Sequence, residues 1–357
     1  MNKLSILFIV LITISCKSKK PVPAVKTTEV PVKTVVKTHS MSLDDITLLD
    51  NKSINYFAST ITKEDLQKHL RKLTSDEFEG RRTGEKGQKV AAKYLADFYR
   101  SLNIEGAVGE DNYYQHIPKS FFNGRSKNDS ENVVGFIYGT EKPEEIVVIS
   151  AHYDHLGIED GVVFDGADDN GSGTAGVMEI AEAFHKAALE GEGPKRSVLF
   201  MNLTGEEEGL FGSRYYVKNP IFPLKNTIVD LNIDMIGRVD EAHKNNPNFV
   251  YVIGADKISE ELHYINEAVN KKYMQLDLDY TYNDENDPNR FYYRSDHFNF
   301  AKNGIPIIFY FNGVHADYHK ATDTEEKINY DVLMKRTQLV FLTAWEIANR
   351  EERLKID

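Results

Sequence analysis

The sequence predicts an α/β fold whose central sheet is covered by helices on both faces. Six apolar runs have the length of strands and lack the alternation of a sheet with one solvated face. Segments with helical spacing of apolar residues lie between or after them, at 173–189, 258–271 and 330–350. Apolar strands that alternate with helices are typical of such a sheet. The six runs are 133–138, 146–150, 197–203, 228–234, 249–253 and 305–311.

The first sixteen residues, MNKLSILFIVLITISC, predict a signal peptide over residues 1–15. Lys3 precedes an apolar run that is short for a membrane-spanning helix. Cys16 is the only cysteine, so no intrachain disulfide can form, and it follows the small residue Ser15 as in bacterial lipoproteins. We therefore expect a lipid on Cys16 that anchors a soluble domain to the bacterial cell envelope, facing the periplasm or the exterior. A plain secretory signal or an uncleaved anchor is the alternative.

Residues 16–53 are expected to form a flexible linker, because residues 17–46 are rich in Lys, Thr, Val and Pro and lack aromatic residues. One domain is predicted over 54–357, since the length suits one large domain. Its first part, 61–104, has helical character, with Thr62 placed to cap a helix. The helical pattern breaks at GRRTGEKG (80–87), which is either a surface loop or part of a site.

The formal net charge of −12 argues against nucleic acid as a partner and is compatible with a site that collects metal cations. Histidines and acids follow five successive elements of the predicted fold. Because function gathers at the carboxyl ends of the strands in such sheets, we expect these side chains to lie together. The stretches are AHYDH (151–155), GADDNGSG (166–173), TGEEEG (204–209), Asp234 and YHKATDT (318–324).

A cluster of imidazoles and carboxylates needs positive charge in its midst. Nitrogen and oxygen donors without thiolate suit zinc or a similar divalent ion. The cluster offers more ligands than one catalytic zinc uses, so two ions that share a bridging carboxylate fit the sequence better. Such a pair would favour a bridging hydroxide at neutral pH.

The motifs HYD, GADDNGSG, GEEEGLFGS, NIDMIG and YHKATDT, in this order, resemble the co-catalytic zinc aminopeptidases, metallopeptidase family M28, in its bacterial lipoprotein branch. The resemblance covers residues 66–328, and the combination is specific although each motif alone is weak. It implies an α/β/α sandwich with a mixed, mostly parallel, twisted sheet of the zinc-peptidase (phosphorylase/hydrolase-like) type. It also implies two Zn²⁺ per chain, about 3.5–4 Å apart.

The resemblance assigns the metal ligands position by position. His152 and Asp234 would ligate one zinc. His319 and Glu207 would ligate the other, and Asp169 would bridge the two. Its neighbour Asp168 would shape the loop.

Three catalytic roles also follow from the resemblance. Glu206 would act as general base, taking a proton from the zinc-activated water and passing it to the leaving amine. Asp154 would accept the other N–H of His152 and fix its tautomer. Tyr318 would donate to the oxyanion, or else serve only in packing. Glu208 is expected to be a solvated or loop-supporting residue.

Two histidines near the motifs, His155 and His315, lie off the family pattern and are expected to be loop or rim residues. Ser295, Asp296 and His297 are expected to form pocket wall at best. A serine-type triad is excluded there, because adjacent residues cannot reach the relay geometry.

The resemblance implies a zinc exopeptidase, an aminopeptidase that hydrolyses N-terminal residues from peptide substrates and meets the membrane only through its lipid. A glutamate-carboxypeptidase-like or dipeptidase activity is the alternative, with Arg238, Arg290 or Arg294 binding the substrate's terminal carboxylate. A single-zinc glutaminyl cyclase and an inactive binding module are further alternatives. The uninterrupted GEEEGLFGS and HYD motifs favour two metals and hydrolysis.

Overall fold

The computed structural model describes residues 41–109 and 111–357. The predicted signal peptide, the lipid on Cys16 and most of the predicted linker lie outside the described residues. Residues 41–53, which were assigned to the linker, run along the domain: Ile46 and Leu48 pack on its largest core, and the N–H of Leu49 donates to Glu346 over 3.2 Å. In the described part of the chain, no helix combines the length and the hydropathy that a membrane crossing requires.

A mixed sheet of nine strands forms the centre of the described part of the chain. Its spatial order is β1-β3-β7-β4-β8-β11-β9-β10, with β2 paired to β3, and β5 and β6 form a separate hairpin. The strands are β1 (Glu105–Gly106), β2 (Tyr114–Ile117), β3 (Ser130–Ile137), β4 (Lys142–His152), β5 (Gly157–Glu159), β6 (Val162–Phe164), β7 (Arg196–Leu203), β8 (Thr227–Ile233), β9 (Phe249–Ile253), β10 (Asp277–Asp279) and β11 (Ile307–Phe311).

The middle of the sheet is parallel, and an antiparallel pair joins it to the flanking strands on each side. Strands β7, β4, β8 and β11 run in one direction. Strand β3 pairs antiparallel with β7, and β9 pairs antiparallel with β11. The predicted mixed α/β sheet is confirmed, and its four parallel strands end at one edge.

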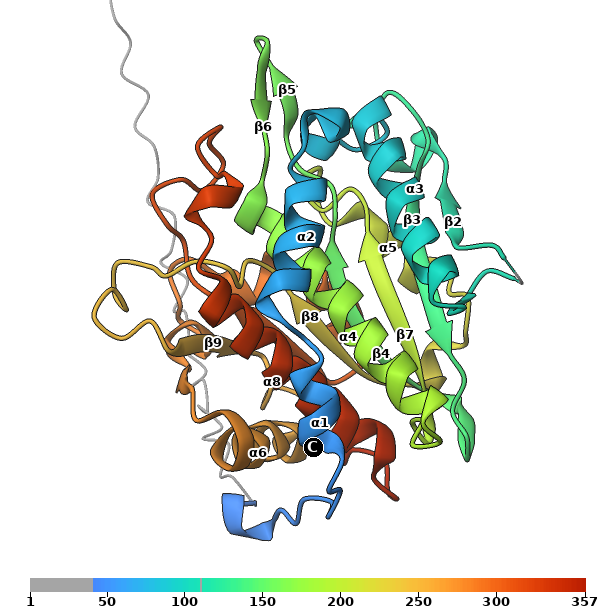
Figure 1. Cartoon of the computed structure of the whole chain (residues 1–357), viewed down its shortest axis with the longest axis vertical. Coiled ribbons are helices and arrows are strands. Elements are labelled where there is room, and N and C mark those ends of the chain that lie inside the picture. The colour runs from blue at the N-terminus through green and yellow to red at the C-terminus, as the bar shows by residue number, and fades with distance from the viewer. Residues whose placement is uncertain (1–40, 110) are drawn as a thin grey trace, which may run out of the picture. The chain divides into compact units, whose positions relative to one another are not determined.

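Helices cover both faces of this sheet (Figure 1). They are α1 (Ile54–Ser59), α2 (Lys63–Leu73), α3 (Lys86–Ser101), α4 (Gly173–Leu189), α5 (Phe211–Lys218), α6 (Glu260–Val269), α7 (His297–Ala301) and α8 (Tyr330–Asn349). The largest core joins one face of the sheet to α1–α4, α6 and α8. A smaller core joins the other face to α5 and α7.

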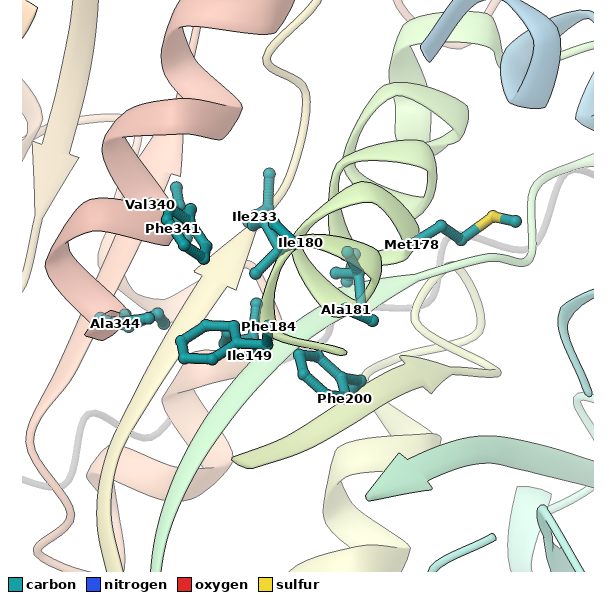
Figure 2. Packing of buried hydrophobic residues seen from close by; sticks show 14 of the residues in the cluster. Ile149, Met178, Ile180, Ala181, Phe184, Phe200, Ile233, Val340, Phe341 and Ala344 are labelled. Carbon is teal, nitrogen blue, oxygen red and sulfur yellow. The ribbon is translucent and has the colours of Figure 1, made fainter. Parts of the chain in front are cut away.

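The two cores explain why the central strands read as unbroken apolar runs. In β4, Val147 and Ile149 belong to the larger core, whereas Ile146 and Val148 belong to the smaller one. Successive side chains of a strand point to opposite faces, so both sets must be apolar when both faces are covered. Figure 2 shows Phe184 of α4 in the larger core, together with side chains of the sheet and of α8.

Candidate metal centre

The predicted ligands meet at the edge where the parallel strands end. His152 is the last residue of β4, and Asp234 directly follows β8. Glu206 and Glu207 lie in the turn between β7 and α5, and Asp169 lies in the turn Ala167–Ser172 that opens α4. The fifth ligand, His319, comes from the long loop between β11 and α8.

The first candidate metal position lies between His152, Asp169 and Asp234. The Nε2 atom of His152 is 3.3 Å from Oδ1 of Asp169 and 3.4 Å from Oδ1 of Asp234. Two ligand atoms bound to one tetrahedral zinc lie about 3.3 Å apart, since each is about 2.0–2.1 Å from the ion. This Nε2 is buried and makes no hydrogen bond within the described residues. The donors therefore fit a divalent cation.

The second candidate position lies between Asp169, Glu207 and His319. Nε2 of His319 is 3.1 Å from Oδ2 of Asp169 and 3.2 Å from Oε2 of Glu207. Asp169 thus presents Oδ1 to the first position and Oδ2 to the second, as a bridging carboxylate would. The five residues named as ligands from the sequence are all brought together.

Glu206 lies beside these ligands at a larger separation. Its Oε2 is 3.9 Å from Nε2 of His152, beyond the spacing of two ligands on one zinc. Burial, together with the charges of Asp234 and Glu207, raises the pKa of Glu206 well above its usual value. A buried carboxyl with a raised pKa is suited to accept and return a proton.

Asp154 supports the site differently from the sequence-based expectation. The nearest acceptor for Nδ1 of His152 is the backbone oxygen of Asp154 at 3.1 Å, while the carboxylate lies 3.7 Å away. The carboxylate accepts hydrogen bonds from the hydroxyl of Thr83 at 2.6 Å and from the N–H of Glu206 at 3.2 Å. Asp154 therefore holds both the imidazole and the backbone of Glu206.

Arg81 and Ser295 support the site through hydrogen bonds that were not predicted. Arg81 is fully buried, and its guanidinium donates to the carbonyl oxygen of Tyr153 at 2.7 Å and to that of Gly166 at 3.0 Å. It thereby ties the end of β4 to the turn that carries Asp169. The hydroxyl of Ser295 donates to Oδ2 of Asp234 at 2.6 Å, which leaves Oδ1 facing His152.

His155 and His315 lie in loops, as expected, but both are buried and neither is a rim residue. His155 is 1% exposed, and its Nδ1 lies 2.8 Å from Oε1 of Glu207. His315 is also buried and lies 3.1 Å from Oδ2 of Asp168, whose Oδ1 accepts the N–H of Gly237. Asp168 thus braces the loop, as predicted. The sequence signal for His155 was its place in HYDH, three residues after His152.

A small pocket opens beside the cluster. Asp169, Glu206 and Asp234 form its polar end, with Tyr318 and Arg294 also in its wall. Burial and the nearby carboxylates raise the pKa of Tyr318, so its phenol stays protonated and can donate a hydrogen bond. The remaining wall is apolar and consists of Met235, Phe291, Phe309, Phe311 and Val314.

The fold and the cluster define an α/β sandwich protein with a candidate two-cation centre at the carboxyl ends of its parallel strands. The sequence model of Peptidase family M28 matches residues 132–344, and the chain belongs to this family.

Individual relatives match over shorter stretches. The chain is 37% identical over 105 residues to a probable glutamate carboxypeptidase LAMP1 of Arabidopsis thaliana, covering 29% of this chain and 14% of the relative. It is 28% identical over 249 residues to aminopeptidase YwaD of Bacillus subtilis, covering 66% of this chain and 48% of the relative. The chain thus spans about half or less of the length of these curated relatives. The crystal structure of BSAP, a zinc aminopeptidase from Bacillus subtilis, shares the fold, with a TM-score of 0.62 and 16% identity over 82% of this chain and 97% of that one.

Proposed function

We propose that this protein is a zinc-dependent exopeptidase, an aminopeptidase that hydrolyses N-terminal residues from peptides and uses two zinc ions per chain. The observation that carries the proposal is the spacing within the cluster. Five donors lie at the separations expected around two ions, and one further carboxylate, Glu206, lies beside them outside that spacing. When bound, zinc supplies Lewis acidity at the scissile carbonyl and lowers the pKa of water.

The chain's own residues would carry the remaining steps. Glu206 would take the proton of the attacking water and deliver it to the departing amine. The phenol of Tyr318 would donate a hydrogen bond to the oxygen on which charge develops. The apolar wall formed by Met235, Phe291 and their neighbours would hold the side chain of the terminal residue and exclude water.

The experiment is a digest of a defined peptide library by purified protein, with and without a chelator, read by mass spectrometry. We expect residues to be lost from the amino end only, and the loss to stop when zinc is removed. Zinc-loaded protein that leaves every peptide intact would contradict the proposal and favour a binding module. One tightly held zinc with no hydrolysis would favour a glutaminyl cyclase.

A second candidate, carboxypeptidase-like or dipeptidase activity, is favoured by Arg294. Arg238 is already paired, 2.8 Å from Asp317 and 3.6 Å from Asp323. Arg294 lines the pocket, and its Nη2 donates to the phenol oxygen of Tyr318 at 3.4 Å. It forms no ion pair with any residue in 41–109 or 111–357, so it is available to a substrate carboxylate.

This second candidate predicts a contrast between dipeptides with free and amidated carboxyl ends. Arg294→Met should lower kcat/KM for the free dipeptide about 10–100-fold, because a hydrogen bond to a charged group contributes about 1.5–3 kcal/mol. The amidated dipeptide serves as the control and should be little affected. An equal loss on both substrates would show that Arg294 does not read the carboxylate. Steady-state kinetics on the two dipeptides measures the difference.

We further propose that the protein is a lipoprotein of the bacterial cell envelope, anchored through Cys16. The support is the sequence alone, since only the small residue Ser15 separates the apolar run from the only cysteine. Wild-type protein expressed in a bacterium should incorporate a labelled fatty acid, and Cys16→Ser should abolish the label. A variant that is labelled as strongly as the wild type would contradict lipid attachment at this residue.

A further inference from the structure

His155 is a buried histidine beside the second metal position that has no role in the proposed chemistry. Its Nδ1 lies 2.8 Å from Oε1 of Glu207 and 3.9 Å from Oδ2 of Asp169. Its Nε2 is buried and makes no hydrogen bond within the described residues. The imidazole therefore reaches the site through Nδ1 alone.

The distances separate two roles that His155 could have there. Pairs of ligand atoms around one zinc lie about 3.3 Å apart, and the contacts of His319 with Asp169 and Glu207, at 3.1 and 3.2 Å, are close to that value. The 2.8 Å contact of His155 with Glu207 is shorter and matches an N–H···O hydrogen bond. His155 is thus placed as a hydrogen-bond donor to a ligand.

The unpartnered nitrogen points to the same tautomer. If Nδ1 carries the proton, Nε2 is an unsatisfied acceptor. If Nδ1 offered its lone pair to a metal, Nε2 would be a buried N–H without an acceptor, and such orphaned N–H groups are rarer in proteins than under-satisfied acceptors. The Nδ1–H form is therefore favoured.

This hydrogen bond divides the two oxygens of Glu207 between two imidazoles. Oε1 faces His155, and Oε2 faces His319 across the second metal position. We propose that His155 is a positioning residue for the second zinc: its Nδ1–H holds Oε1 of Glu207, so that Oε2 alone is presented to the ion. The inference rests on the proposed function in so far as the ion is zinc.

The test is a zinc titration of metal-free protein in competition with a chromogenic chelator, which yields the affinities of both sites. Losing a hydrogen bond that orients a ligand costs about 10–100-fold in metal affinity. We expect His155→Ala to weaken one of the two affinities by that factor and to leave the other near the wild-type value. His319→Ala removes a ligand itself and should weaken the same site more.

A conservative variant distinguishes the donor from a ligand. In His155→Asn the amide nitrogen can occupy the place of Nδ1 and donate to Glu207, but it cannot ligate zinc. We expect this variant to keep a zinc affinity close to that of the wild type. His116→Ala, which changes an exposed histidine of β2, is the matched control and should have no effect.

Three outcomes would overturn the inference. His155→Ala with both affinities unchanged would show that the hydrogen bond does not matter for metal binding. His155→Asn as weak as His155→Ala would show that the imidazole ligates zinc or serves in packing. In either case the wild type still binds two zinc ions, and the proposed function stands. A wild-type chain that binds no zinc would overturn both the inference and the proposed function.

Discussion

The run Glu206-Glu207-Glu208 places three adjacent carboxylates in three different environments. Glu207 faces His319, with Oε2 at 3.2 Å from the imidazole. Glu206 points into the pocket next to the metal positions. Glu208 lies 3.9 Å from Arg82 and takes no part in the cluster. Adjacent acids can therefore have unrelated functions, because the turn after β7 sends their side chains in different directions.

These environments predict three different outcomes for substitution by glutamine. Glu206→Gln should lower kcat by about 10²–10⁴-fold, the usual contribution of a general acid or base, with two zinc ions retained. Glu207→Gln should lower zinc content, because it removes a charged ligand. Glu208→Gln is the matched control and should change neither quantity. Steady-state kinetics and metal analysis of the same preparations measure both effects.

Loss of zinc in Glu206→Gln would mean that Glu206 is itself a ligand, and the proposed base would then be wrong. Full activity in Glu206→Gln would exclude any acid–base role. A loss of zinc in Glu208→Gln would show that the turn as a whole, and not a particular carboxylate, holds the ion.

The residues of the site could be predicted from the sequence only where a motif points to them. His152, Asp169, Glu207, Asp234 and His319 stand at motif positions, and the structure places them together. His155, Arg81 and Ser295 contribute through burial and hydrogen bonds to segments distant in the sequence. Ser295, for example, hydrogen-bonds Asp234, which lies 61 residues away in the sequence, and no local pattern predicts such a contact.

At the scale of elements, the segment Gly80–Thr83 links the helical layer to the metal centre. A Cβ atom on Gly80, which has a φ of +63°, would come within 2.4 Å of the carbonyl oxygen of Phe164, so this position requires glycine. Arg81 and Thr83 then reach the end of β4. The sequence left 80–87 as either a surface loop or part of a site, and the burial of Arg81 and Thr83 with their hydrogen bonds to Tyr153 and Asp154 favours the second.

Thr83 offers a test of this support. Thr83→Val keeps the shape of the side chain but removes the hydroxyl that donates to the buried carboxylate of Asp154 at 2.6 Å. A hydrogen bond to a charged group contributes about 1.5–3 kcal/mol, so the free energy of unfolding should fall by about that amount. Urea unfolding measures it.

Two further variants serve as controls for Thr83→Val. Thr83→Ser retains a hydroxyl and should recover most of the stability. Thr324→Val removes a hydroxyl that bonds the exposed Glu326 and should change little. If Thr83→Val were as stable as the wild type, the contact with Asp154 would not support the site.

Elements that carry a pattern of their own could be predicted from the sequence. The expected helix at 173–189 coincides with α4, and the strand at 249–253 coincides with β9. The cap at Thr62 is also confirmed, since its hydroxyl accepts the N–H of Asp65 at 3.1 Å. Strand β1 has two residues, and the hairpin of β5 and β6 has strands of three, too short to show periodicity. These short strands form because neighbouring strands pair with them, and their own sequences show no strand pattern.

At the scale of the whole molecule, the cluster joins segments that are up to 167 residues apart in the chain, from His152 to His319 (319 − 152). In the metal-free state the carboxylates of Asp169 and Glu207 lie against the imidazole of His319. Burial lowers the pKa of His319, but its contacts with Asp169 and Glu207 outweigh burial and raise the pKa to about 10. Protons therefore compete with zinc for the same nitrogens.

This competition predicts that zinc stabilises the fold more as the pH rises. At pH 6–8 the metal-free His319, with a pKa of about 10, is protonated, and zinc can bind only when that proton leaves. An ion present at a hundredfold excess over its Kd adds about 2.7 kcal/mol to the free energy of unfolding. Each pH unit should enlarge this increment by about 1.4 kcal/mol per released proton, until the pH reaches the pKa of the metal-free histidine.

Urea unfolding of zinc-loaded and chelator-treated protein at pH 6, 7 and 8 measures the increment directly. The increment should grow with pH because the metal-free state loses stability as the pH rises. The raised pKa of His319 stabilises the metal-free fold fully below the unfolded pKa of about 6.5. This contribution is lost as the pH rises toward the folded pKa of about 10. The zinc-loaded state carries no proton on that nitrogen and does not lose stability this way. In His319→Ala, the stabilisation by the ion at the second position should no longer depend on pH, and the affinity for that ion should largely be lost. An increment that is equal at pH 6 and pH 8 would show that the ion does not bind through His319.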